Sequence, residues 1–255
     1  MTDPIPHLMR PDPKDDDAAP VEQVNGHPKG VLSPFHLAVL TNEGVSEEIA
    51  RKFCVTHTAK GHHGVAVRWY DADGTRTPYL YVPKPRPENS PKGLWNLGNE
   101  GKTTHPGWFR RPQGTKLLLV EGTIQSLAAA SWAPQDWGVV GLQGCRALHK
   151  GVDLSWAYGL DVMIAFDADR DRNPDVRQAL EGAVARLRAA GARTVSAWNI
   201  PETEGAKTGL DDFLKALAPE ARTEAVLGLE KSQTVILRDP VKDISDSCVN
   251  GFRPC

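Results

Sequence analysis

The sequence predicts an α/β fold in which a parallel sheet, flanked by helices, follows a small α+β domain. The first support is a set of near-continuous apolar runs, which strands buried on both faces require. These runs cover residues 116–120, 138–142, 161–166 and 194–199. The second support is their alternation with helical stretches, which is typical of a parallel, Rossmann-like sheet.

The clearest helix of this half follows Asn173, a capping residue, with Pro174 at the first helical position. Apolar residues then recur on one helical face, namely Val176, Leu180, Ala183, Val184 and Leu187. We expect the helix to end at Gly191, because glycine tolerates the left-handed backbone found at helix ends.

The first half of the chain contains shorter elements. Ser33, followed by a proline, predicts the start of one helix, and Ser46 predicts the start of a second. The apolar segments 65–70 and 78–82 flank a glycine-containing turn and predict a β-hairpin or meander.

These differences divide the chain into four regions. Residues 1–30 are rich in Pro and Asp and predict a disordered lead. Residues 31–114 form the small α+β domain, 115–230 the α/β domain, and 231–255 an irregular tail.

The bulk composition disfavours several classes of protein. The 255 residues are 40% apolar and carry a net charge of −2. No apolar run approaches the roughly 20 residues that span a bilayer, and the amino terminus does not resemble a signal peptide. None of the four cysteines forms a C-x-x-C pair, which disfavours a zinc ribbon. We therefore expect a cytoplasmic protein without a membrane partner.

Acidic residues follow the predicted strands of the second half. Glu121 follows the first strand, Asp167 and Asp169 follow the third, and Asp211 and Asp212 come after the fourth. Because the carboxyl ends of parallel strands share one edge of a sheet, these carboxylates are expected to converge. A hard divalent cation such as Mg²⁺, or Mn²⁺, relieves their mutual repulsion.

The spacing of the first acids fits such a site. Residues i and i+2 of an extended segment point the same way, so Asp167 and Asp169 are able to face one metal ion. Gly122, directly after Glu121, permits a tight turn and the close approach of a phosphate.

The ordered set of Val120-Glu121-Gly122 and Asp167-x-Asp169-Arg170 resembles the Toprim signature of bacterial primases, topoisomerases and overcoming-lysogenization-defect nucleases. Residues 32–217 as a whole resemble a family of Toprim-linked proteins from phages, plasmids and integrative elements. The resemblance implies a Toprim domain over 115–230.

The resemblance also implies roles for single residues. Glu121 would be a general acid/base or metal ligand, and Asp167 and Asp169 would hold Mg²⁺. Arg170 would contact a phosphate, and Gly122 would let it approach. The pair 211–212 would hold a second ion or position the first. The implied reaction is phosphoryl transfer, primase-like in the replication of a mobile element, or else nuclease cleavage.

Several alternatives stay open at this point. The acids after the strands also read as solvated or helix-capping residues, and those at 211–212 complement a helix dipole. A second alternative is a non-catalytic module that uses the same scaffold to bind nucleic acid or a replication partner. A phosphatase that uses Asp167 as nucleophile is a third reading. The chain contains no G-x-x-x-x-G-K-[ST] loop, so a helicase partner would be a separate protein.

The segment 60–116 suggests a contact with nucleic acid. It carries ten Lys/Arg against four Asp/Glu, and it interleaves them with aromatic residues. Such a combination suits single-stranded DNA, with charge for the backbone and rings for the bases, although the rings also suit a core. We expect Arg110, Arg111 and Lys116 to contact phosphate.

Overall fold

The computed structural model describes most of the chain between residues 30 and 231. The described residues are 23–24, 27–28, 30–59, 62–70, 74, 76–81, 83, 93–95, 106–144, 147–148, 152–168, 173–201 and 208–231. The predicted disordered lead and irregular tail lie almost entirely outside them.

The described helices are α1 (Pro34–Asn42), α2 (Glu47–Phe53), α3 (Thr123–Trp132), α4 (Pro174–Ala189), α5 (Leu210–Lys215) and α6 (Arg222–Lys231), with 3-10 turns at Ser155–Ala157 and Pro219–Ala221. A two-stranded ribbon consists of β1 (Gln23–Val24) and β2 (His27–Pro28). The main sheet contains β3 (Cys54–Ala59), β4 (His62–Tyr70), β5 (Arg76–Tyr81), β6 (Gly93–Trp95), β7 (Gly107–Arg110), β8 (Lys116–Glu121), β9 (Gly138–Leu142), β10 (Asp161–Ala165) and β11 (Thr194–Ala197).

The main sheet has the order β11-β10-β8-β9-β7-β4-β5-β6, and β3 pairs with β4 outside this path. Strands β11, β10, β8 and β9 are mutually parallel, and every other pairing is antiparallel. The fold is therefore mixed α/β with a parallel core, which confirms the predicted parallel sheet. The predicted hairpin is also present, as the antiparallel pair β4 and β5.

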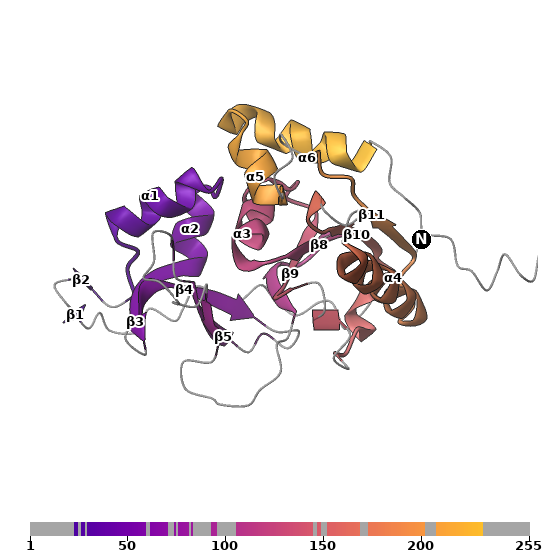
Figure 1. Cartoon of the computed structure of the whole chain (residues 1–255), viewed down its shortest axis with the longest axis horizontal. Helices are drawn as coiled ribbons and strands as arrows, with labels where there is room; N and C mark the ends of the chain where they lie inside the picture. The colour runs from indigo at the N-terminus through magenta and orange to yellow at the C-terminus, as the bar shows by residue number, and fades with distance from the viewer. Residues whose placement is uncertain are drawn as a thin grey trace, which may run out of the picture.

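The antiparallel strands continue the sheet beyond its parallel core. Strand β7 pairs with β9 on one side, and its Trp108 pairs with Tyr70 of β4 on the other. Strands from the predicted regions 31–114 and 115–230 thus belong to one sheet (Figure 1).

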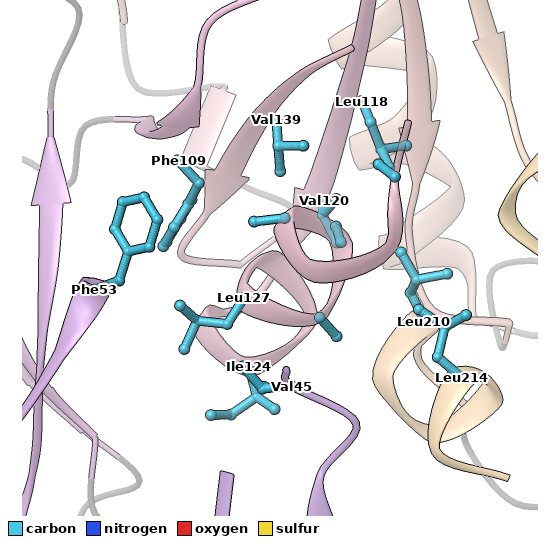
Figure 2. Close-up of a cluster of buried hydrophobic side chains, with 14 of the residues drawn as sticks. Val45, Phe53, Phe109, Leu118, Val120, Ile124, Leu127, Val139, Leu210 and Leu214 are labelled. Carbon is cyan, nitrogen blue, oxygen red and sulfur yellow. The ribbon is translucent and has the colours of Figure 1, made fainter. Parts of the chain in front are cut away.

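The sheet separates two layers of core. Leu118 and Val120 of β8 face a cluster that includes residues of α2, α3, α5 and α6. Figure 2 shows part of this cluster, including Ile124 and Leu127 of α3 and Leu210 and Leu214 of α5. The alternate β8 residues, Leu117 and Leu119, face a second cluster that includes α4.

Helix α4 and its neighbours follow the sequence expectations closely. The Asn173 side chain accepts a hydrogen bond from the Asp175 amide at the helix start. The five apolar residues predicted to share a face are all buried, and Gly191 adopts a φ of 87° just beyond the end. Ser33 and Ser46 likewise accept hydrogen bonds at the starts of α1 and α2. Local capping chemistry therefore sets these boundaries.

None of the helices in the described part of the chain combines the length and apolarity that crossing a membrane requires.

Helix α6 contains a glycine that gives a simple stability test. Gly228 is exposed, and a Cβ built on it meets nothing within 4 Å. Gly228→Ala should raise the free energy of unfolding by about 1 kcal/mol, because alanine loses less backbone entropy in a helix. Urea denaturation measures this, and a variant less stable than the parent would contradict the position of Gly228 within α6.

Candidate functional site

Glu121 and Asp167 both lie at the carboxyl edge of the parallel sheet. Glu121 is the last residue of β8, and Asp167 lies two residues beyond the end of β10. The two strands are neighbours, with Val120 paired to Ala165. Both acids therefore lie at the edge where the sequence placed them, whereas Asp169 and Arg170 lie outside the described residues.

Gly122 forms the turn between β8 and α3. Its φ of 86° and ψ of 155° belong to a region that only glycine adopts without strain. Its amide donates to the Leu142 carbonyl at 2.6 Å, and a Cβ built on it meets nothing within 4 Å. The backbone conformation therefore requires a glycine at position 122, and the space beside the turn is open.

Asp167 is held by a hydrogen bond from α3. Its side chain is only 6% exposed, and its Oδ1 accepts a 2.6 Å hydrogen bond from Gln125 Nε2. The Gln125 Oε1 atom accepts a hydrogen bond from the Leu210 amide at the start of α5. One amide side chain therefore connects the loop after β10 with α5.

The acids of α5 lie next to this connection. A Cβ on Gly209 would lie 2.5 Å from Gln125 Nε2 and 2.6 Å from Asp211 Oδ1. The Gly209 amide also donates to Asp212 Oδ2 at 3.3 Å. Gln125 Nε2 and Asp211 Oδ1 therefore both border the space beside Gly209.

A second acidic group combines this pair with Glu43, the residue that directly follows α1. Carboxylate oxygens of Glu43, Asp211 and Asp212 lie within 4.8 Å of one another, so they could hold a metal ion. Lys215 Nζ contacts Glu43 Oε2 at 3.0 Å and Asp212 Oδ1 at 2.6 Å. Sequence reasoning missed Glu43, because no local pattern links the end of α1 to α5.

Burial is the main cause of the raised pKa of Asp211. Burial, followed by repulsion from the Asp212 carboxylate, raises the pKa of Asp211 from 3.8 to about 6. Burial opposes the charge of Lys215, but hydrogen bonds to Asp212 and Glu43 outweigh it and raise the pKa of Lys215 above its usual value. The lysine thus stays charged beside the acids.

The raised pKa of Asp211 predicts a pH-dependent stability. The folded chain binds the Asp211 proton more tightly than the unfolded chain does, so this group favours folding most at low pH. That contribution is lost as pH rises from the unfolded value of 3.8 to about 6. With a chelator present, Asp211→Asn should therefore be more stable than the parent at neutral pH, by about 3 kcal/mol.

Urea denaturation of Asp211→Asn across this pH range checks the effect, and the advantage should vanish at the acid end. Asp136→Asn, in an exposed turn before β9, serves as the matched control. An advantage that grows as pH falls would contradict the assigned burial.

The basic residues predicted to contact phosphate lie away from this edge. Arg110 pairs with Val139, which pairs with Leu118, and Lys116 begins β8. Together with Arg111, they therefore lie toward the amino-terminal edge of the parallel strands, opposite Glu121. Their contact with phosphate stays a prediction, and it concerns a surface other than the carboxyl edge.

Each of these basic side chains also has partners within the protein. Arg110 donates to the end of α3 and the turn that follows, namely to the carbonyls of Ala130, Ala133, Pro134 and Trp137 and to Gln135 Oε1. The Arg111 guanidinium lies 4.0 Å from the Trp108 ring centroid. Lys116 pairs with Glu230 at 2.5 Å. These contacts give all three residues a structural role.

Most of the described aromatic side chains in the basic segment belong to the core. Trp69, Tyr81, Trp108 and Phe109 are all less than 10% exposed. For these four rings the core alternative holds, because a buried ring cannot stack on a base without rearrangement. The side chains of Tyr79 and Trp95 lie outside the described part.

Two further polar residues at the carboxyl edge were missed by sequence reasoning. Gln143 follows β9, and its Nε2 atom donates to Thr123 Oγ1 at 2.5 Å. Gln125 was missed as well, because a glutamine within a helix carries no sequence signal of its own.

Comparisons with known proteins give no family for this chain: no protein-family model matches it, and no curated protein matches it. The geometry of the carboxyl edge and the motifs of the sequence are therefore the basis for assigning a function.

Proposed function

We propose that the protein is a Toprim-type, Mg²⁺-dependent enzyme that acts on nucleic-acid phosphodiesters, with a primase-like reaction. The observation that supports this most strongly is that Glu121 and Asp167 follow neighbouring parallel strands at the same edge of the sheet. Their order and spacing are those of the Toprim signature that the sequence resembles. Fold alone does not fix function, so the proposal depends on this site.

The residues at the edge fit a hard divalent cation. Glu121 and Asp167 offer carboxylate oxygens, which are the ligands that Mg²⁺ prefers. These two residues would hold the ion, together with Asp169 by the resemblance. When bound, the ion would supply charge stabilisation to the phosphate oxygens of the substrate.

The chain's own residues have separable tasks in this proposal. Gly122 leaves open space at the turn, where a phosphate is able to approach the backbone. Glu121 exchanges a proton with the attacking or leaving oxygen. Asp167, buried and held by Gln125, keeps one orientation. The nucleophile would be a 3′-hydroxyl in primer synthesis and water in cleavage.

Single-stranded DNA is the substrate that we propose, with a separate helicase or replication protein as partner. The net basic charge of segment 60–116 supports a nucleic-acid partner. The buried aromatic side chains of that segment limit this support to charge rather than base stacking.

One observation favours a second candidate, a non-catalytic module that binds nucleic acid or a replication partner. Lys215 already places a positive charge between Glu43 and Asp212. The charge of this acidic group is therefore partly neutralised without a metal ion, as it would be in a scaffold that has no chemistry to perform.

Incubation of the purified protein with end-labelled single-stranded DNA, nucleoside triphosphates and Mg²⁺ or Mn²⁺ distinguishes the candidates. Extended or newly made chains would establish nucleotidyl transfer, and shortened DNA would establish a nuclease. In either case the Glu121→Gln variant should be inactive. Bound DNA without any product would reject the enzyme and favour the binding module.

A further inference from the structure

We infer that Gln125 is a positioning residue that holds the Asp167 carboxylate and the start of α5 in one arrangement, so that Asp167 and Asp211 serve the same site. The inference rests on the proposed function and deepens it. It assigns a task to a side chain that the Toprim resemblance does not include.

The donor side of the Gln125 amide determines the orientation of Asp167. Its Nε2 atom lies 2.6 Å from Asp167 Oδ1, and the carboxylate is almost fully buried. A hydrogen bond to a buried charged group is stronger than one between neutral groups, because little water competes with it. Gln125 thereby contributes to fixing the orientation of this carboxylate.

The oxygen of the same amide, Gln125 Oε1, holds the start of α5 by a hydrogen bond. Leu210, fully buried, donates its backbone amide to Gln125 Oε1 at 3.2 Å. A neighbouring backbone contact, from the Ala168 amide to the Thr208 carbonyl at 3.0 Å, joins the same two loops. Glutamine suits this position because it carries a donor and a strong acceptor on one planar group, whereas ionised glutamate lacks the donor and methionine has no donor and only a weak acceptor.

Gly209 leaves the space that this arrangement needs. A Cβ at this position would lie 2.5 Å from Gln125 Nε2 and 2.6 Å from Asp211 Oδ1, closer than non-bonded atoms approach. The backbone φ of −89° suits any residue, so alanine would bring no backbone strain. Gly209→Ala should therefore leave the fold intact while it displaces both side-chain ends.

The test measures Mn²⁺ affinity from the electron paramagnetic resonance signal of the free ion. The full-length parent is compared with Gln125→Met, Gly209→Ala and the matched control Gly228→Ala. Groups that orient metal ligands typically account for about 10- to 100-fold in affinity, so both site variants should weaken Mn²⁺ binding by that factor. The control should bind as the parent does, and thermal melting without metal should show that all variants are folded.

A second readout separates positioning from a structural role. For the reaction on single-stranded DNA, both site variants should lower kcat by about 10-fold or more while KM for DNA stays near that of the parent. Parent-like Mn²⁺ affinity in folded Gln125→Met and Gly209→Ala would overturn the inference and leave the proposed function standing. A parent that binds no Mn²⁺ would overturn the inference together with the metal-dependent function.

Discussion

Asp167→Asn is expected to lower turnover of the nucleic-acid substrate by at least about 100-fold. Asparagine has the shape of aspartate, and its oxygen is able to accept the hydrogen bond that Gln125 donates to Asp167 Oδ1. The variant thus removes the charge of a metal ligand and preserves its surroundings. Steady-state rates with Mg²⁺ and labelled single-stranded DNA give the measurement.

The control for this prediction is the free energy of unfolding of the same variant, measured by urea denaturation. Because the buried hydrogen bond is kept, Asp167→Asn should unfold within about 1 kcal/mol of the parent. The substitution Asp136→Asn, at an exposed turn, should change neither stability nor turnover. Turnover that survives in folded Asp167→Asn would remove Asp167 from the catalytic group.

Arg110→Met is expected to lower the free energy of unfolding by about 3 kcal/mol. The guanidinium of Arg110 satisfies four backbone carbonyls at the end of α3 and in the following turn, together with one side-chain oxygen. The carbonyls at a helix end have no partners within the helix, so the loss of Arg110 removes a donor from each, although Pro134 keeps the Trp137 amide. Urea denaturation measures the change.

Arg111→Met provides the comparison for this effect. The Arg111 guanidinium stacks on Trp108, a contact worth about 1 kcal/mol. Its loss should therefore destabilise the protein much less than the loss of Arg110. If Arg110→Met instead kept the parent's stability and weakened DNA binding, Arg110 would be a phosphate contact rather than a structural cap.

The parallel core of the fold was predictable because its signals are local. The apolar runs at 116–120 and 138–142 became β8 and β9 within one residue, since strands buried on both faces exclude polar residues. Helix α4 was equally predictable, because a capping residue marks its start, apolar residues recur on one face, and a glycine follows its end. The continuation of the sheet through β7 was not predictable, because its pairing with β9 and β4 depends on contacts between distant segments.

The candidate site was predictable only in part, for the same physical reason. Glu121 and Asp167 were found because each directly follows an apolar strand, and parallel strands place such residues at one edge. Gln125 and Glu43 gave no signal, because their importance arises from contacts with residues far along the chain. The contacts of Arg110 were not predictable either, because no local pattern reveals its carbonyl partners at the end of α3 and in the turn that follows.

The most direct test of the central claim is to locate the bound divalent cation. Mn²⁺ affinity is compared in the parent, Glu121→Gln, Asp167→Asn and Glu43→Gln, with the metal-free melting temperature as a check on folding. The account predicts that the first two substitutions weaken binding by at least about 10-fold, whereas Glu43→Gln leaves it unchanged. Binding that is lost in Glu43→Gln and kept in the other two would place the ion at the Glu43, Asp211 and Asp212 group and contradict the account.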